Sequence, residues 1–243
     1  MEKTEYQKMD AIENDHAWFL AKYDFLLTIL KKVKISREQK IIDIGCGTGA
    51  VMKKLSDSGY QVEGIDNSLD ALSYCQQKGL TVSNGTAEKI DVPNDYCDVV
   101  ISLDVLEHLD NDKSAVTEFH RILKTGGYVI ATVPAHQFLW SYHDEALHHK
   151  RRYGQAEFNG LFAEGFEVVI KSWLHASIFL PTLLMRTLKN KNNKDQSTSD
   201  VDMPSSFVNN ILRAVYFFEI LFFKIFSYLP FGLSLVIVAR KKT

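Results

Sequence analysis

The sequence predicts an α/β fold, in which β-strands and helices alternate along one chain. An apolar β-type run at residues 41–44 breaks into alternating glycines at 45, 47 and 49 and then enters a helix-like segment at 51–55. Further β-type runs at 61–65 and 98–102 are separated from each other by a helix-like segment at 69–78, an order typical of α/β proteins. A chain of 243 residues with 46% hydrophobic content is long enough to bury one such core.

The glycine run predicts a cofactor site. Glycines at alternate positions remove the Cβ atoms that would keep a flat, polar ligand away from the main chain, and the strand–turn–helix junction presents backbone N–H groups. A dinucleotide site has the spacing G-x-G-x-x-G, whereas this chain has G-x-G-x-G preceded by Asp43. That carboxylate would repel a pyrophosphate but could hold the ammonium group of an amino acid. The predicted cofactor is therefore S-adenosylmethionine rather than NAD, and its contacts include Asp43, Gly45, Cys46, Gly47 and Gly49.

Further cofactor contacts are expected where the later strands end. Asp66 follows the strand predicted at 61–65, where its carboxylate can accept hydrogen bonds from both ribose hydroxyls. The segment 85–88 follows a short third strand and would border an adenine ring. The remaining contacts predicted here are Asn67, Thr86, Ala87, Glu88 and Leu103.

The motif D-x-G-C-G-x-G at 43–49 and the later L-E-H at 106–108 resemble those of class I S-adenosylmethionine-dependent methyltransferases. The resemblance covers about residues 40–134, with the motifs in the family's order. It implies a Rossmann-like, seven-stranded, mostly parallel sheet with helices on both faces. Thr86 departs from the pattern, because many members have an acidic residue beside the adenine.

With this fold, the chain divides into four parts. We expect an N-terminal aromatic and helical lid at 1–39, a methyltransferase core at 40–175, an apolar helical insertion with a polar linker at 176–232, and the final strand of the core at 233–243. Within the core, a helix is expected to end at 118–123 and another to lie at 155–163. The last three strands are expected at 128–133, 166–172 and 235–239.

The insertion is the unusual part of the chain. Residues 176–188 and 207–229 are apolar, and the polar stretch between them, 189–206, is typical of a linker. Arg213, Glu219 and Lys224 interrupt the second apolar stretch, which leaves less than the ~20 residues of a membrane span. One interpretation is a helix in the membrane interface, with Lys189, Lys191, Lys194 and Arg213 available for anionic headgroups. The other is that this face packs on the domain or forms a homodimer contact.

A second unusual segment, 140–153, is dense in imidazole, guanidinium and aromatic groups, which are poor core material. It follows the fifth strand at the end where open α/β sheets bind ligands. Arg151 and Arg152 could hold a phosphate or carboxylate of an acceptor, and aromatic rings could stack on it. The predicted acceptor residues of this segment are Trp140, Tyr142, His148, His149, Arg151, Arg152 and Tyr153. The alternative is a solvated loop with local ion pairs.

A metal site at His143, Asp144, His148 and His149 is not expected. The spacing H-E-x-x-H is absent, and the neighbouring Arg and Lys side chains would oppose a dication.

Catalytic and lid residues complete the candidate site. His108, just past the fourth strand, and His143 could remove a hydroxyl proton during methyl transfer, although a structural role for His108 is equally compatible with its motif. In similar methyltransferases an N-terminal aromatic segment covers the cofactor, which assigns Trp18 and Phe19 to the acceptor pocket. Core packing of the helix around 23–27 is the alternative for both rings.

These observations predict an S-adenosylmethionine-dependent methyltransferase. The aromatic N-terminus, the cluster at 140–153 and the apolar insertion resemble a bacterial and archaeal branch associated with surface-glycan biosynthesis, which implies O-methylation of a lipid phosphate, lipid-linked sugar or glycan. A quinone or other aromatic acceptor is the alternative, and a non-catalytic binding protein is the alternative of another class. A net charge of −2 gives no indication of nucleic-acid binding. Three scattered cysteines and the lack of a signal segment predict a cytoplasmic protein, at the inner face of the membrane if the insertion binds lipid.

Overall fold

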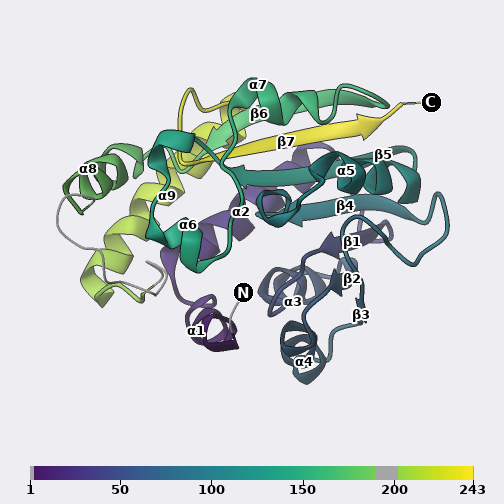
Figure 1. Ribbon diagram of the computed structural model, residues 1–243, viewed down its shortest axis with the longest axis horizontal. Coiled ribbons are helices and arrows are strands. Elements are labelled where there is room, and N and C mark those ends of the chain that lie inside the picture. The colour runs from purple at the N-terminus through teal and green to yellow at the C-terminus, as the bar shows by residue number, and fades with distance from the viewer. Residues whose placement is uncertain (1–2, 190–201, 243) are drawn as a thin grey trace.

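A computed structural model describes residues 3–189 and 202–242. Its centre is one seven-stranded sheet, in which β7 lies between β5 and β6 and is antiparallel to both (Figure 1). The other neighbouring pairs are parallel. In sheet order the strands are β3 (Val82–Asn84), β2 (Gln61–Asp66), β1 (Lys40–Ile44), β4 (Cys97–Leu103), β5 (Leu123–Pro134), β7 (Ser234–Lys241) and β6 (Phe166–Leu174). The predicted seven-stranded, mostly parallel α/β fold is confirmed.

Helices cover both faces of the sheet because its strands are apolar on both sides. Neighbouring strand residues enter different core clusters: Ile42 and Val100 pack on one side, and Ile41 and Val99 pack on the other. The first side is covered by α5 (Asp112–Ile122) and α7 (Gln155–Gly160), and the second by α2 (Ala17–Lys32), α3 (Ala50–Asp57) and α9 (Ser206–Phe226). The remaining helices are α1 (Lys3–Ile12), α4 (Leu69–Gln77), α6 (Tyr142–Ala146) and α8 (Phe179–Lys189), with single turns η1 (Leu106–His108) and η2 (Gln137–Leu139).

The helix α9 lies along α2 (Figure 1). At one end the Asn209 Oδ1 atom accepts a hydrogen bond of 2.9 Å from the backbone N–H of Ala17. In the middle the rings of Phe25 and Phe223 meet edge to face, with their centroids 5.4 Å apart. Glu219 is buried, and its carboxylate accepts hydrogen bonds from the backbone N–H groups of residues 176 and 177, which compensate for its removal from water. One face of the insertion helix therefore packs on the domain, as one of the two interpretations predicts.

The opposite face of α9 is apolar and exposed. Its exposed large side chains include Phe207, Ile211, Phe217, Phe218, Leu221, Phe222, Ile225 and Phe226. By length and composition alone, α9 could cross a membrane, since it has 21 residues and contains an 18-residue window with a mean hydropathy of 1.3, although Arg213, Glu219 and Lys224 interrupt its apolar stretch. Residues 190–201 of the predicted linker, which include Lys191 and Lys194, and the side chain of Lys189 lie outside the described residues, and Ser206, the last residue of that linker, begins α9.

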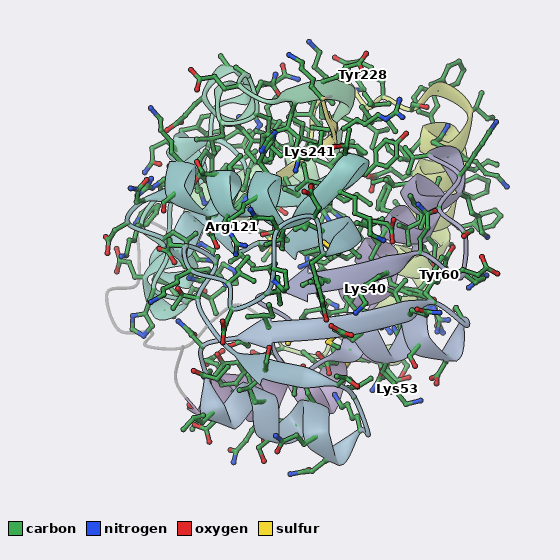
Figure 2. All side chains as sticks on the ribbon, turned by 90° about the vertical axis from the view of Figure 1, so that its right-hand side faces the viewer. Lys40, Lys53, Tyr60, Arg121, Tyr228 and Lys241 are labelled. Carbon is green, nitrogen blue, oxygen red and sulfur yellow. The ribbon has the colours of Figure 1, made fainter. Side chains whose placement is uncertain are left out.

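The amino-terminal ends of the parallel strands form the end of the molecule that faces the viewer in Figure 2. Here Lys40 pairs with Glu63, Arg121 with Glu118, and Lys241 with Asp95 at 2.8–2.9 Å. Ligand-binding side chains therefore belong at the other end of the sheet, where α1, α6, α8 and part of α9 gather (Figure 1).

Candidate cofactor and acceptor site

A cavity of about 940 Å³ lies at the carboxyl ends of the parallel strands. The predicted cofactor residues on its wall are Gly45, Gly47, Asp66, Asn67, Thr86, Ala87, Glu88 and Leu103. A second cavity of about 100 Å³ shares Gly45, Gly47 and Leu103 with it and adds Asp43 and Cys46. The main cavity therefore lies at the end of the sheet where the sequence predicts the cofactor, and most of the predicted cofactor residues line it.

The three glycines of the loop have different roles, although all have positive φ (71°, 55° and 83°). A Cβ atom on Gly45 would lie 2.5 Å from Val105 Cγ2, and one on Gly49 would lie 2.8 Å from Cys75 Sγ. A Cβ atom on Gly47 would meet nothing within 4 Å. Gly45 and Gly49 thus permit close packing inside the protein, and Gly47 opens the main chain to a ligand. Gly49 lines neither cavity.

Asp66 joins this loop to the end of β2. Its two carboxylate oxygens accept hydrogen bonds of 2.9 Å from the backbone N–H groups of Gly47 and Ser68. Each oxygen of a carboxylate can accept more than one hydrogen bond, so both can still accept from the hydroxyls of a ribose. Asp66 is therefore suited to hold a nucleoside while fixing the loop beneath it.

Asp43 is a buried carboxylate on the small cavity. Burial raises its pKa to about 7, the nearby charge of Asp66 adds to this effect, and the ammonium of Lys22 opposes it. A cation placed in the cavity beside Asp43 would stabilise the ionised form of this carboxylate. The amino-acid ammonium group of S-adenosylmethionine supplies such a cation, so the residues present fit the predicted cofactor.

The helix α1, which the sequence analysis did not predict, is fastened to the glycine loop. Glu13, which is buried just beyond α1, accepts a hydrogen bond of 2.5 Å from Thr48 Oγ1 and one of 2.9 Å from Lys78 Nζ. Lys78 also donates to the Thr48 carbonyl oxygen at 2.8 Å. The N-terminal segment therefore lies against the glycine loop, and it lines the main cavity with Glu5, Tyr6 and Met9.

The lid also makes a polar contact with the end of β4. Lys22 of α2 forms an ion pair with Asp104, whose other oxygen accepts a hydrogen bond of 3.0 Å from Thr132 Oγ1. Burial acts to raise the pKa of Asp104, but these partners hold it below the usual value. The backbone of Asp104 has φ 58°, in the left-handed region that Asp adopts more readily than most other non-glycine residues. Both Lys22 and Asp104 line the main cavity. The sequence analysis did not identify them as site residues, because only the folded chain brings them together.

Trp18 and Phe19 line the main cavity. The indole of Trp18 also stacks on the imidazole of His175, with ring centroids 3.7 Å apart. Burial lowers the pKa of His175 to about 3, so its ring is neutral near pH 7. Trp18 therefore lines the cavity and also packs on a buried side chain.

The segment 140–153 is built around one buried carboxylate, Asp144. It accepts hydrogen bonds from Arg152 Nε (2.7 Å) and the Ser141 backbone N–H (2.9 Å), and lies 2.9 Å from His149 Nδ1. Burial opposes ionisation of Asp144, but these groups hold its pKa well below the usual value. Asp144 is therefore an anion that organises the segment from within.

The two predicted anion-binding arginines are engaged with the protein's own carboxylates. Arg152 is buried against Asp144, and Arg151 pairs with Asp112 at 3.0 Å and donates to the carbonyl oxygen of Leu109. Tyr153 is fully buried, with its hydroxyl 2.8 Å from Asp112 Oδ2. The ion-pair alternative describes these residues better than acceptor binding does.

The other predicted residues divide into two groups. His108, His143, His148, His149 and Arg152 line the main cavity, whereas Trp140, Tyr142, Arg151 and Tyr153 do not. Burial, with the neighbouring His149, lowers the pKa of His108 to about 4, so that its imidazole is neutral near pH 7. The insertion contributes Asp202 to the wall, together with Ile178, Thr182, Met185 and Arg186, which have the i, i+4, i+7 and i+8 spacing of one helix face.

Residues 42–131 match the family model described as a methyltransferase domain. The ubiquinone biosynthesis O-methyltransferase of Cereibacter sphaeroides is 32% identical over 99 residues, which are 38% of this chain and 40% of that protein. The enzyme of the same name from Methylococcus capsulatus is 34% identical over 99 residues, 37% of this chain and 41% of that protein. The chain thus spans about two fifths of the length of these curated relatives.

Solved structures match nearly the whole chain at lower identity. A SAM-dependent methyltransferase of Thermotoga maritima is 21% identical, with a TM-score of 0.59 over 98% of this chain and 97% of that one. A SAM-dependent methyltransferase of Archaeoglobus fulgidus is 18% identical, with a TM-score of 0.60 over 90% and 94% of the two chains. These likenesses agree with the fold described above.

Proposed function

Because residues 42–131 form a class I S-adenosylmethionine-dependent methyltransferase domain, we propose that this protein methylates a hydroxyl group of an apolar, quinol-type aromatic acceptor. The observation that carries the proposal is the composition of the cavity. Part of the wall is formed by the glycine loop and Asp66, and other parts by the aromatic rings of Trp18 and Phe19 and by Ile178 and Met185 of the insertion. A polar cofactor and an apolar acceptor can meet there.

Two observations favour an aromatic acceptor over the lipid phosphate, lipid-linked sugar or glycan expected from the sequence. The relatives matched in the cofactor half are named ubiquinone biosynthesis O-methyltransferases. In addition, Arg151 and Arg152, on which phosphate binding would depend, are already paired with Asp112 and Asp144. Recruiting either arginine would leave a buried or half-buried carboxylate without its cation, which costs several kcal/mol.

The exposed face of α9 supports an acceptor dissolved in a membrane. The only acidic residue of α9, Glu219, points inward, whereas Arg213 and Lys224 are exposed among its phenylalanines. An apolar helix face that carries only cations suits an anionic lipid surface. Placed there, α8 would lie between the membrane and the cavity, with Leu180 and Leu184 exposed and Ile178 and Met185 on the cavity wall.

The cofactor supplies an electrophilic methyl group on a sulfonium when bound. The chain's residues then act mainly by position: Asp43 holds the ammonium group, Asp66 the ribose, and the aromatic lid orients the acceptor, which favours in-line transfer. His143, on the cavity wall, is the candidate to take the hydroxyl proton. The low pKa of His108 makes it a weak base.

The test is methyl transfer from labelled S-adenosylmethionine to a panel of probes. The probes are a catechol with a short isoprenyl chain, phosphatidic acid and undecaprenyl phosphate, each in detergent. We expect label in the catechol alone. Asp66→Ala should weaken cofactor binding, and Asp91→Ala, an exposed carboxylate outside the cavity, is the matched control. Label in a phosphate-bearing lipid alone would reverse the acceptor assignment, and absence of both binding and transfer would indicate a non-catalytic protein.

A further inference from the structure

Three side chains with metal-binding chemistry meet on the cavity wall. Glu107 and His108 lie in η1, directly after β4, and His149 follows α6. One ligand atom from each lies within 4.8 Å of the other two. His149 Nε2 is 3.9 Å from Glu107 Oε1, and the rings of His108 and His149 are nearly perpendicular, with centroids 4.7 Å apart. Two imidazoles and one carboxylate are a common donor set for Zn²⁺ and other divalent transition metals.

Glu107 provides an independent observation. Its side chain is fully buried, and neither carboxylate oxygen makes a hydrogen bond of normal geometry with any residue that the structure describes. Buried polar groups are almost always hydrogen-bonded, and an unpaired one costs several kcal/mol. A buried carboxylate with two unused oxygens, beside two imidazoles, is the arrangement that a cation would complete.

The basic residues nearby do not fill this role. Arg152 pairs with Asp144 at 2.7 Å, Arg151 with Asp112 at 3.0 Å, and Lys150 with Asp110 at 2.5 Å. Each of these positive charges is matched by its own carboxylate. The repulsion of a dication that the sequence analysis expects from these residues is therefore reduced, and none of them makes a hydrogen bond with Glu107.

The second nitrogen of His149 is already oriented for metal binding. Its Nδ1 atom lies 2.9 Å from Asp144 Oδ1, and Asp144 is held as an anion by Arg152 and the Ser141 amide. With Nδ1 turned to this carboxylate, Nε2, the atom nearer Glu107, is the nitrogen that faces the proposed metal position. A carboxylate behind a histidine in this way fixes the tautomer and ring orientation in many metal sites.

We propose that Glu107, His108 and His149 bind a divalent transition-metal ion such as Zn²⁺, with the remaining coordination positions open to the cavity. The role that follows rests on the proposed function: the ion holds the acceptor hydroxyl and lowers its pKa. In the transfer, the carbon–sulfur bond breaks with its electron pair left on sulfur, the carbon–oxygen bond forms, and the hydroxyl proton passes to His143 or water. The metal keeps its charge and oxidation state throughout.

The test begins with metal binding by the full chain after treatment with a chelator. Calorimetric titration with ZnCl₂ should give one ion per chain, and Zn²⁺ should raise the melting temperature. Glu107→Gln and His149→Gln should each weaken Zn²⁺ binding by about 100-fold or more, and Asp144→Asn by about 10–100-fold. His120→Gln, on α5 and away from the cavity, is the matched histidine control and should bind as the parent does.

Two outcomes would overturn the proposal. One is the absence of Zn²⁺ binding by the parent chain, and the other is equal binding by the parent and Glu107→Gln; either result means that Glu107 is a protonated acid packed beside His149. His108→Gln, a change at a half-buried side chain, keeps the test open if Glu107→Gln does not fold. Zn²⁺ binding without methyl transfer would contradict the proposed function alone, and full transfer in excess EDTA would contradict the metal's role alone.

Discussion

Replacing Asp43 with asparagine should stabilise the protein and weaken cofactor binding at the same time. The pKa of Asp43 is raised from 3.8 to about 7, mainly by burial. The native state therefore binds the proton more tightly than the unfolded chain, so the contribution of this group to stability is full below pH 4 and declines as the pH rises to 7. At about 1.36 kcal/mol per pKa unit, the loss above pH 7 is about 4 kcal/mol.

The side chain of asparagine cannot ionise, so Asp43→Asn removes this penalty at pH 8 and changes little at pH 4. For a domain of this size, a gain of about 4 kcal/mol corresponds to a rise in melting temperature of about 8–16 °C. The same change removes the charge that pairs with the cofactor's ammonium group. A charge-assisted hydrogen bond contributes about 1.5–3 kcal/mol, so the Kd for S-adenosylmethionine should rise by about 10–100-fold at pH 8.

Differential scanning calorimetry at pH 4 and pH 8, with cofactor titrations at pH 8, checks both parts. The matched control is Asp57→Asn, which removes an exposed carboxylate paired with Lys53 and should show neither effect. A variant less stable than the parent at pH 8, or equally changed at both pH values, would refute the account of Asp43 as a buried and destabilised carboxylate. Unchanged cofactor affinity would remove Asp43 from the site.

Three further predictions concern the lid, the segment 140–153 and the insertion. Lys22→Met should lower the free energy of unfolding by about 1–3 kcal/mol at pH 7, because Asp104 loses its cation, and this loss should shrink as the pH falls below 4. Equal denaturant midpoints for the parent and the variant at pH 7 would contradict this prediction. Arg151→Ala should lower the melting temperature by a few degrees and leave the Kd for S-adenosylmethionine unchanged, whereas a change in that Kd with no change in stability would mean that Arg151 contacts ligand rather than Asp112. Phe218→Ser combined with Phe222→Ser should reduce sedimentation of the protein with phosphatidylglycerol vesicles by at least about tenfold. Its stability should not change, since both rings are exposed, and undiminished sedimentation would show that α9 does not bind the membrane.

The cofactor half could be predicted because its signals are local. The glycines at 45, 47 and 49, the acids at 43 and 66, and the strands between them lie within one short stretch of chain, so spacing alone fixes their arrangement. All three glycines adopt the positive φ that only glycine tolerates easily. What spacing could not separate is which glycine faces the ligand, because the packing against Val105 and Cys75 comes from other elements.

The acceptor half was predicted less well because its contacts join distant segments. Arg151 and Asp112 lie 39 residues apart, and Lys22 and Asp104 lie 82 apart. A charged cluster in sequence looks the same whether its partners are solvent, a ligand or buried carboxylates. Glu107 was overlooked for a related reason: nothing in L-E-H indicates that its carboxylate is fully buried and makes no hydrogen bond with the described residues.

The place of β7 in the sheet has a consequence for how the chain folds during synthesis. β7 comes after the whole insertion in sequence, yet it lies inside the sheet and supplies the strand contacts that join β6 to β5. Until residue 241 has left the ribosome, β5 presents an open edge and β6 has no place in the sheet. Exposed strand edges of this kind recruit other chains, so the nascent protein is most prone to aggregate just before its last strand is released.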